Sequence, residues 1–480
     1  MSGSSLLEFF IFWGVWILIP LLVDVMDGLW SAWIVFVDRH LAAPPPMPFT
    51  GQMPTVSVVI PAYNEQLDID RCLTSLKAQT YPHNLIEYIV VNDGSTDRTA
   101  EVVAGHIDGT GQWNGHIRLH NQVISGEEYG GGLRLVQGER LGKPRAVNLG
   151  LSYTKGELIM AIDSDVVLEP DAVERAVAAF RNDPTLTAAT AHLIVDHNLL
   201  VETDEQGRLK LDENDLPLPL KLNLMQRFLA AAQFIEYLQA FRIGRHAEAT
   251  RGGLFTLSGA CSIFRREALV QAGFYHARTV SEDTDLTLAL QRRGFKIGYL
   301  PHVRVHLAPT VSWKALYAQR VRWQRGELEV LAVHKDMVTN PSNFWTSTIP
   351  QRLWRDHTLA VMRLVWFMLL PLFPLIGYSL TLVAQALGLM VVMYLISDSL
   401  QLLAAYPVCA PAEKKMLRSN LIVLPLMQIY RQAVYFFRVS GILKTLTEPP
   451  RWTVNTNLFR FPGLDYVQKI ARDILEIWAD

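Results

Sequence analysis

Cysteine is scarce in this chain of 480 residues, with only Cys72, Cys261 and Cys409, which lie far apart in the sequence. Neither a disulfide framework nor a zinc site with closely spaced ligands can be built from three such residues. A strong charge of one sign is also lacking, because 44 basic and 46 acidic residues give a formal net charge of -2. Without a basic field, nucleic acid is not an expected partner.

The N-terminal region lacks the basic start and the small-residue cleavage site of a signal peptide. Residues 5–24 are mostly apolar over about the length that spans a bilayer. We therefore expect an uncleaved transmembrane helix there, which residues 28–37 either extend or follow along the interface.

Two further apolar segments lie near the C-terminus. Residues 359–406 are long enough for two crossings with a turn at 374–379. The cationic stretch AEKKMLRSN follows and is expected on the cytoplasmic side. In residues 420–443, Arg431 and Arg438 share one helical face, which should meet protein, water or headgroups because arginine is costly in lipid. That segment is either a crossing that lines a cavity or an interfacial helix.

The middle of the chain alternates strand-like with helix-like runs. Strands are expected over 56–62, 86–93 and 158–165, and helices over 68–79 and 169–180. This alternation implies right-handed crossovers and a mainly parallel sheet in an α/β domain. In such sheets, ligands bind beyond the carboxyl ends of the strands.

Acidic residues occur at those expected strand ends. Glu65 follows the first strand, Asp93 ends the second, and Asp163 and Asp165 end the third. Helix capping explains single acids, but two carboxylates one residue apart repel each other unless a cation or a donor lies between them. A divalent cation held by one carboxylate and by substrate phosphates meets that need. Asp93 is placed to accept an N–H from a nucleobase.

Two other stretches carry candidate groups. GKPRAVN (142–148) places Lys143 beside a glycine that permits close approach, although a solvated surface lysine is the alternative. SEDTD (281–285) precedes a helical run, so Ser281 could be its N-cap while Asp283 and Asp285 interact with the helix dipole. The same carboxylates could instead supply a general base.

Six motifs occur in order: VIPAYNE, VNDGSTD, GKPRAVN, DSD, SED and QRVRW. This ordered set resembles the membrane-embedded processive family 2 glycosyltransferases, which include cellulose, chitin, hyaluronan and poly-N-acetylglucosamine synthases. The likeness covers roughly residues 54–335 and continues more loosely through the C-terminal helices. It implies an α/β GT-A (Rossmann-like) cytoplasmic glycosyltransferase domain plus α-helical transmembrane and interfacial helices.

The activity implied by the resemblance is an inverting hexosyltransferase that depends on a UDP-sugar and on Mg²⁺ or Mn²⁺. It would extend the end of a growing β-linked polysaccharide and couple this to export. The catalytic residues would be Asp283, as general base, and Glu282. Ser281 stands where the family's T-E-D motif has threonine, a change that keeps a hydroxyl.

The resemblance also assigns the binding residues. The nucleotide-sugar would contact Ala62, Glu65, Asp93, Lys143, Asp163, Gln319, Arg322 and Trp323, and Asp165 would hold the metal. The acceptor would contact Trp323, Gly259 and Cys261. Trp452, in PPRWTV, resembles a gating residue. Residues 317–327, a cluster of arginine and glutamine around Trp323, would then grip the diphosphate and the acceptor, with a basic collar at the membrane surface as the alternative.

These features predict an order of segments along the chain. They are an N-terminal transmembrane region (1–38), a linker (39–54), the GT-A domain (55–310), interfacial helices with the Q-x-x-R-W motif (311–358), transmembrane or interfacial helices (359–443) and a C-terminal segment (444–480). The implied location is the plasma (inner) membrane, crossed several times, with the catalytic domain in the cytoplasm. The implied partners are the bilayer, the polymer and accessory export subunits.

Two other functions remain open. A glycolipid glycosyltransferase of the ceramide type shares D-x-D and Q-x-x-R-W but adds a single sugar. A non-catalytic transport or partner subunit is opposed by the intact Asp163, Asp165, Asp283 and Trp323. Product length separates the first two enzymes, and UDP release separates both from the third alternative.

Overall fold

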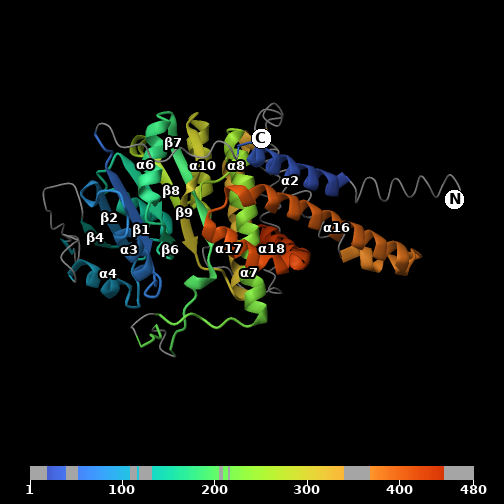
Figure 1. The fold of residues 1–480 in the computed structure, drawn as a ribbon. Coiled ribbons are helices and arrows are strands. Elements are labelled where there is room, and N and C mark those ends of the chain that lie inside the picture. Colours follow the sequence, from blue (N-terminus) through green and yellow to red (C-terminus); the bar gives the residue numbers. More distant parts are fainter. Residues whose placement is uncertain are drawn as a thin grey trace. The chain divides into compact units, whose positions relative to one another are not determined.

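The computed structural model describes residues 19–38, 52–108, 116–117, 132–204, 209–213, 217–339 and 368–447. Trp452, most of the expected linker and most of the expected span at residues 5–24 lie outside these residues. The chain divides into two compact units, shown in Figure 1. An α/β unit contains residues 42–224 and 248–309, and a helical unit contains residues 1–41, 225–247 and 310–480.

One nine-stranded sheet forms the α/β unit, in the order β3-β4-β2-β1-β5-β8-β7-β9-β6. The strands are β1 (Val56–Ala62), β2 (Ile86–Asn92), β3 (His116–Ile117), β4 (Leu133–Gln137), β5 (Leu158–Ile162), β6 (Val166–Leu168), β7 (Leu186–Val195), β8 (Cys261–Arg265) and β9 (Lys296–Leu307). The half from β3 to β5 is parallel, whereas β8 runs antiparallel to both of its neighbours. The mainly parallel α/β fold is confirmed.

Burial explains why the parallel strands could be predicted. All seven residues of β1 and of β2 are buried, as expected for parallel strands covered on both faces, which read as continuous apolar runs. The strand expected over 158–165 ends at Ile162, because the chain turns at Asp163–Asp165, and a further strand, β6, begins at Val166. Strand β6 does not pair with β5 but pairs antiparallel with β9 at the edge of the sheet.

Helices cover both faces of the sheet (Figure 1). They are α3 (Ile69–Lys77), α4 (Thr99–Asp108), α5 (Lys143–Leu151), α6 (Ala172–Asn182), α9 (Arg266–Ala272) and α10 (Glu282–Arg292), with short turns η2 (His83–Leu85) and η3 (His197–Leu199). Apolar residues of α5, α9 and α10 form one core with β1, β5 and β8. Helices α3 and α6 confirm the expectations for residues 68–79 and 169–180.

The helical unit is built from segments far apart in the sequence. They are α2 (Ile19–Asp38), α7 (Leu224–Leu238), η4 (Gln239–Arg245), α8 (His246–Thr250), α11 (Trp313–Val333), α12 (Lys335–Thr339), η6 (Leu370–Ile376), α16 (Leu380–Ala405), η7 (Tyr406–Val408), α17 (Pro411–Asn420), η8 (Leu421–Leu426) and α18 (Met427–Thr447). Helix α11 packs along α18, and α2 packs along α16. Residues 225–247 group with this unit, although the sequence places them inside the expected domain of 55–310.

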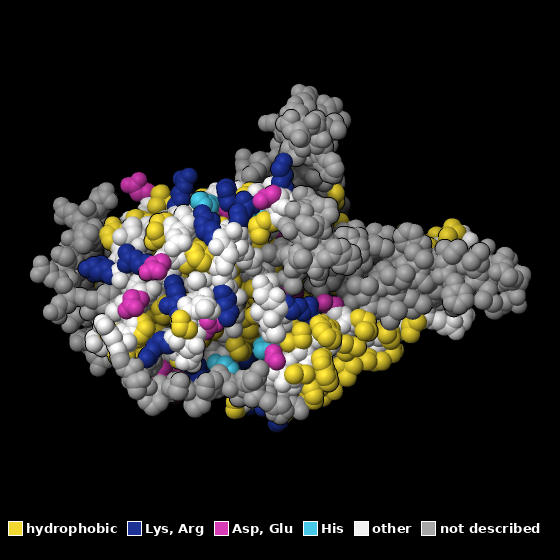
Figure 2. Space-filling model, turned by 90° about the horizontal axis from the view of Figure 1, so that it is seen from above, with side chains coloured by type: hydrophobic (Ala, Val, Ile, Leu, Met, Phe, Trp, Pro, Cys, Tyr) yellow, Lys and Arg dark blue, Asp and Glu magenta, His cyan; other side chains and the backbone are white. Residues whose placement is uncertain are grey.

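Among the described residues, one helical stretch is long and apolar enough to cross a membrane, the 29 residues Leu380–Val408. It follows a turn at Gly377, whose φ of 97° favours glycine, inside the expected turn at 374–379. Figure 2 shows hydrophobic side chains gathered on the helical part and charged ones interspersed elsewhere. A bilayer contact of several helices therefore stays a prediction.

The two arginines expected on one face of residues 420–443 both contact protein. Arg431 makes a two-pronged ion pair with Asp398, with Nη–Oδ distances of 2.6 and 2.8 Å. Arg438 donates from Nε to Gln324 Oε1 at 2.6 Å and forms an ion pair with Glu327 at 3.5 Å. Because α18 turns its arginines toward α16 and α11, their charge is compensated within the helical unit.

Candidate active site

The carboxyl ends of β1 and β2 form one wall of the site. The backbone N–H of Asp93 donates to the carbonyl of Ala62 at 2.8 Å, which joins the two strand ends. The carboxylate of Asp93 accepts the N–H of Leu141 at 2.5 Å and the N–H of Gly142 at 2.7 Å. Asp93 therefore holds the loop that leads into α5, and a contact between Asp93 and a nucleobase stays a prediction.

Lys143 is the first residue of α5 and the cation of the site. Its Nζ lies 2.5 Å from Asp163 Oδ1 and 3.7 Å from Glu282 Oε1. Burial acts to lower the pKa of Lys143, but Asp163 and Glu282 raise it more, so that it ends above its ordinary value. Lys143 is therefore a charged group that joins the D-x-D turn to the start of α10, and not a solvated surface lysine.

Three carboxylates crowd around the turn between β5 and β6. Burial raises the pKa of Glu65 to about 8, helped by the negative charges of Asp165 and other nearby acids. Burial and the carboxylate of Asp163 also raise the pKa of Asp165. Both shifts have the same two causes, burial first and repulsion from neighbouring carboxylates second.

That excess of negative charge fits a divalent cation. No group of three or more His, Cys, Asp or Glu side chains that could hold an ion occurs within the described ranges. A cation held by one carboxylate and by the phosphates of a substrate needs no such group. Asp165 is thus a suitable single ligand, and the bound positive charge would relieve the repulsion between Glu65, Asp163 and Asp165.

Asp283 is held in a fixed orientation at the start of α10. Its Oδ2 accepts the N–H of Gly259 at 3.0 Å, and its Oδ1 accepts the N–H of Thr284 at 2.7 Å. A Cβ at position 259 would lie 3.2 Å from both Asp283 Oδ2 and Lys143 Nζ. Only glycine fits there without a shift of its neighbours, so Gly259 belongs to the site through its backbone.

The other acids of this motif have different surroundings. Glu282 is buried, and burial raises its pKa although Lys143 lowers it. Asp285 is completely buried and makes two hydrogen bonds to Arg278, of 2.7 and 2.8 Å. Ser281 starts α10 without a side-chain capping bond. Asp285 is therefore a structural ion-pair partner, which leaves the half-buried Asp283 as the carboxylate that an acceptor can reach.

Cys261 begins β8, and its side chain is completely buried. Burial raises the pKa of its thiol, so the side chain is neutral and unreactive at ordinary pH. Cys261 therefore packs in the sheet, and any acceptor contact in this segment would come from its neighbour Gly259.

The Q-x-x-R-W residues lie in the helical unit, on α11. Gln319 and Arg322 are half-buried, and Trp323 is 39% exposed. Their contacts with nucleotide-sugar or acceptor stay predictions, as does the gating role of Trp452.

Asn64 and Tyr63 were not predicted as site residues. Asn64 adopts a positive φ of 56° after β1, and its side chain accepts the N–H of Thr96 at 2.8 Å. The exposed ring of Tyr63 is covered by Arg140, whose guanidinium carbon lies 5.3 Å from the ring centroid. An asparagine directly after a buried strand, where a tight turn is needed, was the available signal.

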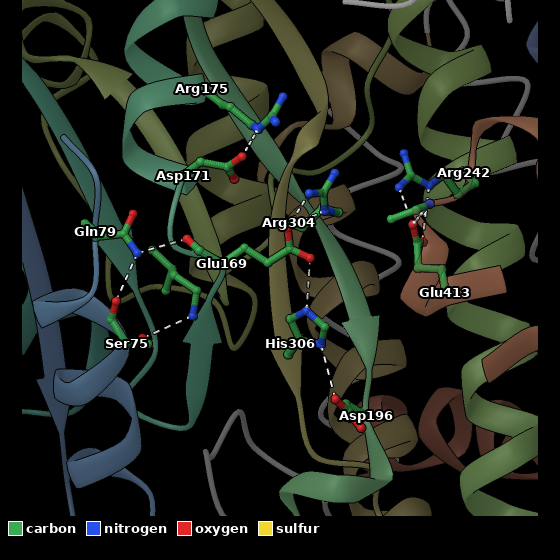
Figure 3. A network of polar contacts seen from close by, with 12 residues as sticks. Ser75, Gln79, Glu169, Asp171, Arg175, Asp196, Arg242, Arg304, His306 and Glu413 are labelled. Atoms are coloured by element: carbon green, nitrogen blue, oxygen red, sulfur yellow. Dashed lines mark hydrogen bonds and ion pairs between the residues drawn. The ribbon is translucent and has the colours of Figure 1, made fainter. Parts of the chain in front are cut away.

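A second polar cluster lies at the edge of the sheet where β6 pairs with β9 (Figure 3). Arg304 donates from Nε to Glu169 at 2.6 Å. The ring nitrogens of His306 lie 3.5 Å from Glu169 and 3.4 Å from Asp196. Burial acts to lower the pKa of His306, but the two carboxylates raise it to about 9. The cluster ties β6, which directly follows Asp165, to the ends of β7 and β9.

Carboxylates and a lysine gathered at the strand ends of an α/β sheet fit a glycosyltransferase, and comparison with known families shows this class. Residues 57–272 match glycosyl transferase family 2, and residues 226–407 match glycosyl transferase family group 2. The chain is a glycosyltransferase whose residues 57–272 match family 2, and it resembles poly-β-1,6-N-acetyl-D-glucosamine synthases.

Two such synthases illustrate the degree of similarity. The protein of Staphylococcus aureus (strain COL) is 25% identical over 276 residues, which cover 58% of this chain and 55% of that protein. The protein of Staphylococcus epidermidis is 24% identical over 280 residues, which cover 58% and 56%. The match thus spans about half the length of these relatives.

Among solved structures, a mannosyltransferase from Pyrobaculum calidifontis in complex with GDP-Man and Mn²⁺ has a TM-score of 0.51 and 18% sequence identity. The match covers 89% of this chain and 98% of that one. It supports the GT-A fold of the α/β unit.

Proposed function

We propose that this protein transfers a sugar, with inversion, from a UDP-sugar to the end of a growing β-linked polysaccharide, and that extension is coupled to export across a membrane. The observation that carries the proposal is the fixed carboxylate of Asp283, which shares one cluster with Lys143 and Asp163. The names of the synthases to which the chain is similar support a polymeric product.

The reaction is a single displacement at the anomeric carbon. The acceptor hydroxyl oxygen bonds to C1 of the sugar while the bond from C1 to the phosphate oxygen breaks, and UDP leaves with the bonding electrons. The hydroxyl proton passes to Asp283, which the N–H groups of Gly259 and Thr284 hold in place. Attack opposite to the leaving group inverts the anomeric configuration.

Lys143 and Asp163 form the donor side of the site. The ammonium of Lys143 is held by Asp163 and Glu282, so it is fixed before the diphosphate arrives. Asp165 would hold Mg²⁺ or Mn²⁺, which supplies positive charge to the departing diphosphate when bound. Glu282, buried beside Lys143, helps to set the position of the Lys143 ammonium.

The helical unit would supply the acceptor and membrane functions. Arg322 would pair with the diphosphate through its planar fork, and Trp323 would offer an aromatic face to the acceptor sugar. The apolar stretch Leu380–Val408 supports a membrane location. The multi-pass arrangement, the cytoplasmic position of the α/β unit and accessory export subunits belong to this proposal as expectations of the resemblance.

Product analysis tests the proposal. Membranes that contain the protein are incubated with radiolabelled UDP-N-acetylglucosamine, UDP-glucose or GDP-mannose, and the products are separated by size. A labelled polymer that linkage-specific hydrolases degrade is expected from one of the UDP-sugars. A single sugar on a lipid would instead support the glycolipid enzyme, and no UDP release with any donor would support a non-catalytic subunit.

A further inference from the structure

Arg320 lies directly against the ring of Trp323, one turn away on α11. Its guanidinium carbon is 4.3 Å from the centroid of the Trp323 ring. This distance is within the range of a cation–π contact. Arg320 is only 6% exposed whereas Trp323 is 39% exposed. One face of the indole is thus covered by a buried cation, while the side chain keeps a solvent-facing surface.

Two other helices hold the guanidinium in place. Arg320 Nη2 donates to Glu236 Oε2 on α7 at 2.6 Å and to the hydroxyl of Tyr430 on α18 at 3.3 Å. The hydroxyl of Tyr430 itself donates to Glu236 Oε2 at 2.6 Å. Because three helices contribute to this triangle, Arg320 cannot leave the indole without leaving a half-buried carboxylate without its cation.

A further polar cluster, formed by Gln239, Arg431 and Asp398, lies next to this triangle along the sequence of the same helical segments. Gln239 follows Glu236 by three residues, and Arg431 follows Tyr430 directly. Gln239 Nε2 donates to Asp398 at 3.0 Å, and Arg431 donates to Gln239 Oε1 at 3.0 Å as well as to Asp398. This cluster fixes η4, which continues α7, against α18 and α16, and none of its bonds involves Trp323.

We propose that Arg320, with Glu236 and Tyr430, is a positioning residue for the acceptor. It holds the indole of Trp323 in one orientation from behind, so that the opposite face is ready for the terminal sugar of the growing chain. The inference rests on the proposed function and adds to it the group that orients the acceptor platform. A freely rotating indole would lose orientation entropy each time an acceptor bound.

Kinetics with separate donor and acceptor give the first test. The probes are UDP-N-acetylglucosamine and a β-1,6-linked N-acetylglucosamine trisaccharide. Arg320→Lys keeps the charge but loses the planar fork, so the acceptor KM should rise roughly 3- to 30-fold, with the donor KM unchanged. Tyr430→Phe, a milder change that keeps the fold, should raise the acceptor KM roughly 2- to 10-fold. The control Arg431→Lys disturbs the neighbouring buried ion pair and should leave the acceptor KM unchanged.

Fluorescence gives a test that does not depend on catalysis. The emission of each protein minus that of its Trp323→Phe counterpart isolates Trp323. The anisotropy of this component should fall in Arg320→Lys and Tyr430→Phe and stay constant in Arg431→Lys. Unchanged anisotropy, or an equal rise of acceptor KM in Arg431→Lys, would overturn the positioning role. If the trisaccharide is not extended at all while the anisotropy falls, transfer to a β-1,6-linked N-acetylglucosamine chain fails and the orientation of Trp323 by Arg320 stands.

Discussion

The ammonium of Lys143 lies 2.5 Å from the carboxylate of Asp163, although the two residues belong to different elements at different strand ends. Asp93 fixes the start of α5 through the N–H groups of Leu141 and Gly142. The carboxylate of Asp93 therefore positions Lys143, and the ion pair between Lys143 and Asp163 in turn positions the D-x-D turn.

Replacement of Lys143 by methionine should weaken donor binding. The variant leaves Asp163 and Glu282 without their cation and removes the positive charge that meets the diphosphate. A charge-assisted contact of this kind contributes about 1.5–3 kcal/mol, or roughly 10- to 150-fold in the dissociation constant. Calorimetric titration with UDP measures it. Lys155→Met, at an exposed lysine just after the same helix, is the control and should bind UDP normally.

Asp283→Asn should affect turnover and Asp285→Asn should affect stability, although the two residues lie on one helical turn. Asp283→Asn loses the base and, because a side-chain amide has one acceptor oxygen, keeps only one of the two N–H contacts from Gly259 and Thr284, so turnover should fall at least about 100-fold while UDP affinity stays near normal. Asp285→Asn breaks the buried pair with Arg278 and should lower the melting temperature. Near-normal turnover of Asp283→Asn would remove it from catalysis.

Removal of divalent ions should stop transfer, and Mg²⁺ or Mn²⁺ should restore it. A readout independent of catalysis is the melting temperature, which UDP should raise further when Mn²⁺ is present, because ligands that bind only the folded state stabilise it. Asp165→Asn should lose this Mn²⁺-dependent increment. Asp171→Asn, at an acid that pairs with Arg175 at the start of α6, should keep it. Transfer that survives rigorous chelation would contradict the assignment.

Sequence patterns predicted the helices and strands that are determined by the residues within the segment itself. β1 and β2 are continuous buried runs, and α3 has apolar residues at helical spacing, so each could be located without knowledge of the rest of the chain. The same patterns placed Glu65, Asp93 and Asp163 near strand ends, where the structure has them, whereas the helix that begins at Lys143 was not predicted.

Features that depend on distant partners could not be predicted. Strand β9 contains Pro301, Arg304 and His306, which read as a poor strand until Glu169 and Asp196 are seen beside it. Arg320 and Glu236 are 84 residues apart, so nothing local relates them. Local sequence left the roles of Asp283 and Asp285 open, and the resemblance chose Asp283; the physical difference, an ion pair of Asp285 with Arg278 and a bond from Gly259 to Asp283, needed the structure.

Gly259→Ala should impair catalysis without unfolding the protein. The added Cβ would stand 3.2 Å from Asp283 Oδ2 and from Lys143 Nζ, so both charged groups must move by a few tenths of an ångström. Small displacements of reacting groups can cost as much as about 100-fold in rate, and steady-state turnover measures the loss. Gly105→Ala, on α4 with nothing within 4 Å of the added Cβ, should be fully active and slightly more stable. Equal activity of both variants would show that the close approach at Gly259 has no catalytic role.

The cluster around His306 should make stability depend on pH in a defined window. Its pKa of about 9 in the folded protein lies above the ordinary value of 6.5, because Asp196 and Glu169 favour the charged ring. The stabilisation is therefore complete below pH 6.5, declines as the pH rises and is lost above pH 9. Glu65, with a pKa of about 8, titrates in the same window, so wild type must be compared with His306→Gln, in which Glu65 is unchanged.

The expected result is a difference in melting temperature that is largest near pH 6 and disappears near pH 9.5. For a unit of this size, each kcal/mol corresponds to roughly 2–4 °C. Calorimetry at closely spaced pH values measures the difference, and high salt should reduce it little because the His306 and Asp196 side chains are mostly buried. Lys296→Gln, which removes an ion pair with Asp183 whose lysine is 58% exposed, is the control and should show no such dependence between pH 6.5 and 9. If wild type and His306→Gln lose stability in parallel across the window, His306 is not charged in the folded protein, and Glu169 and Asp196 do not raise its pKa.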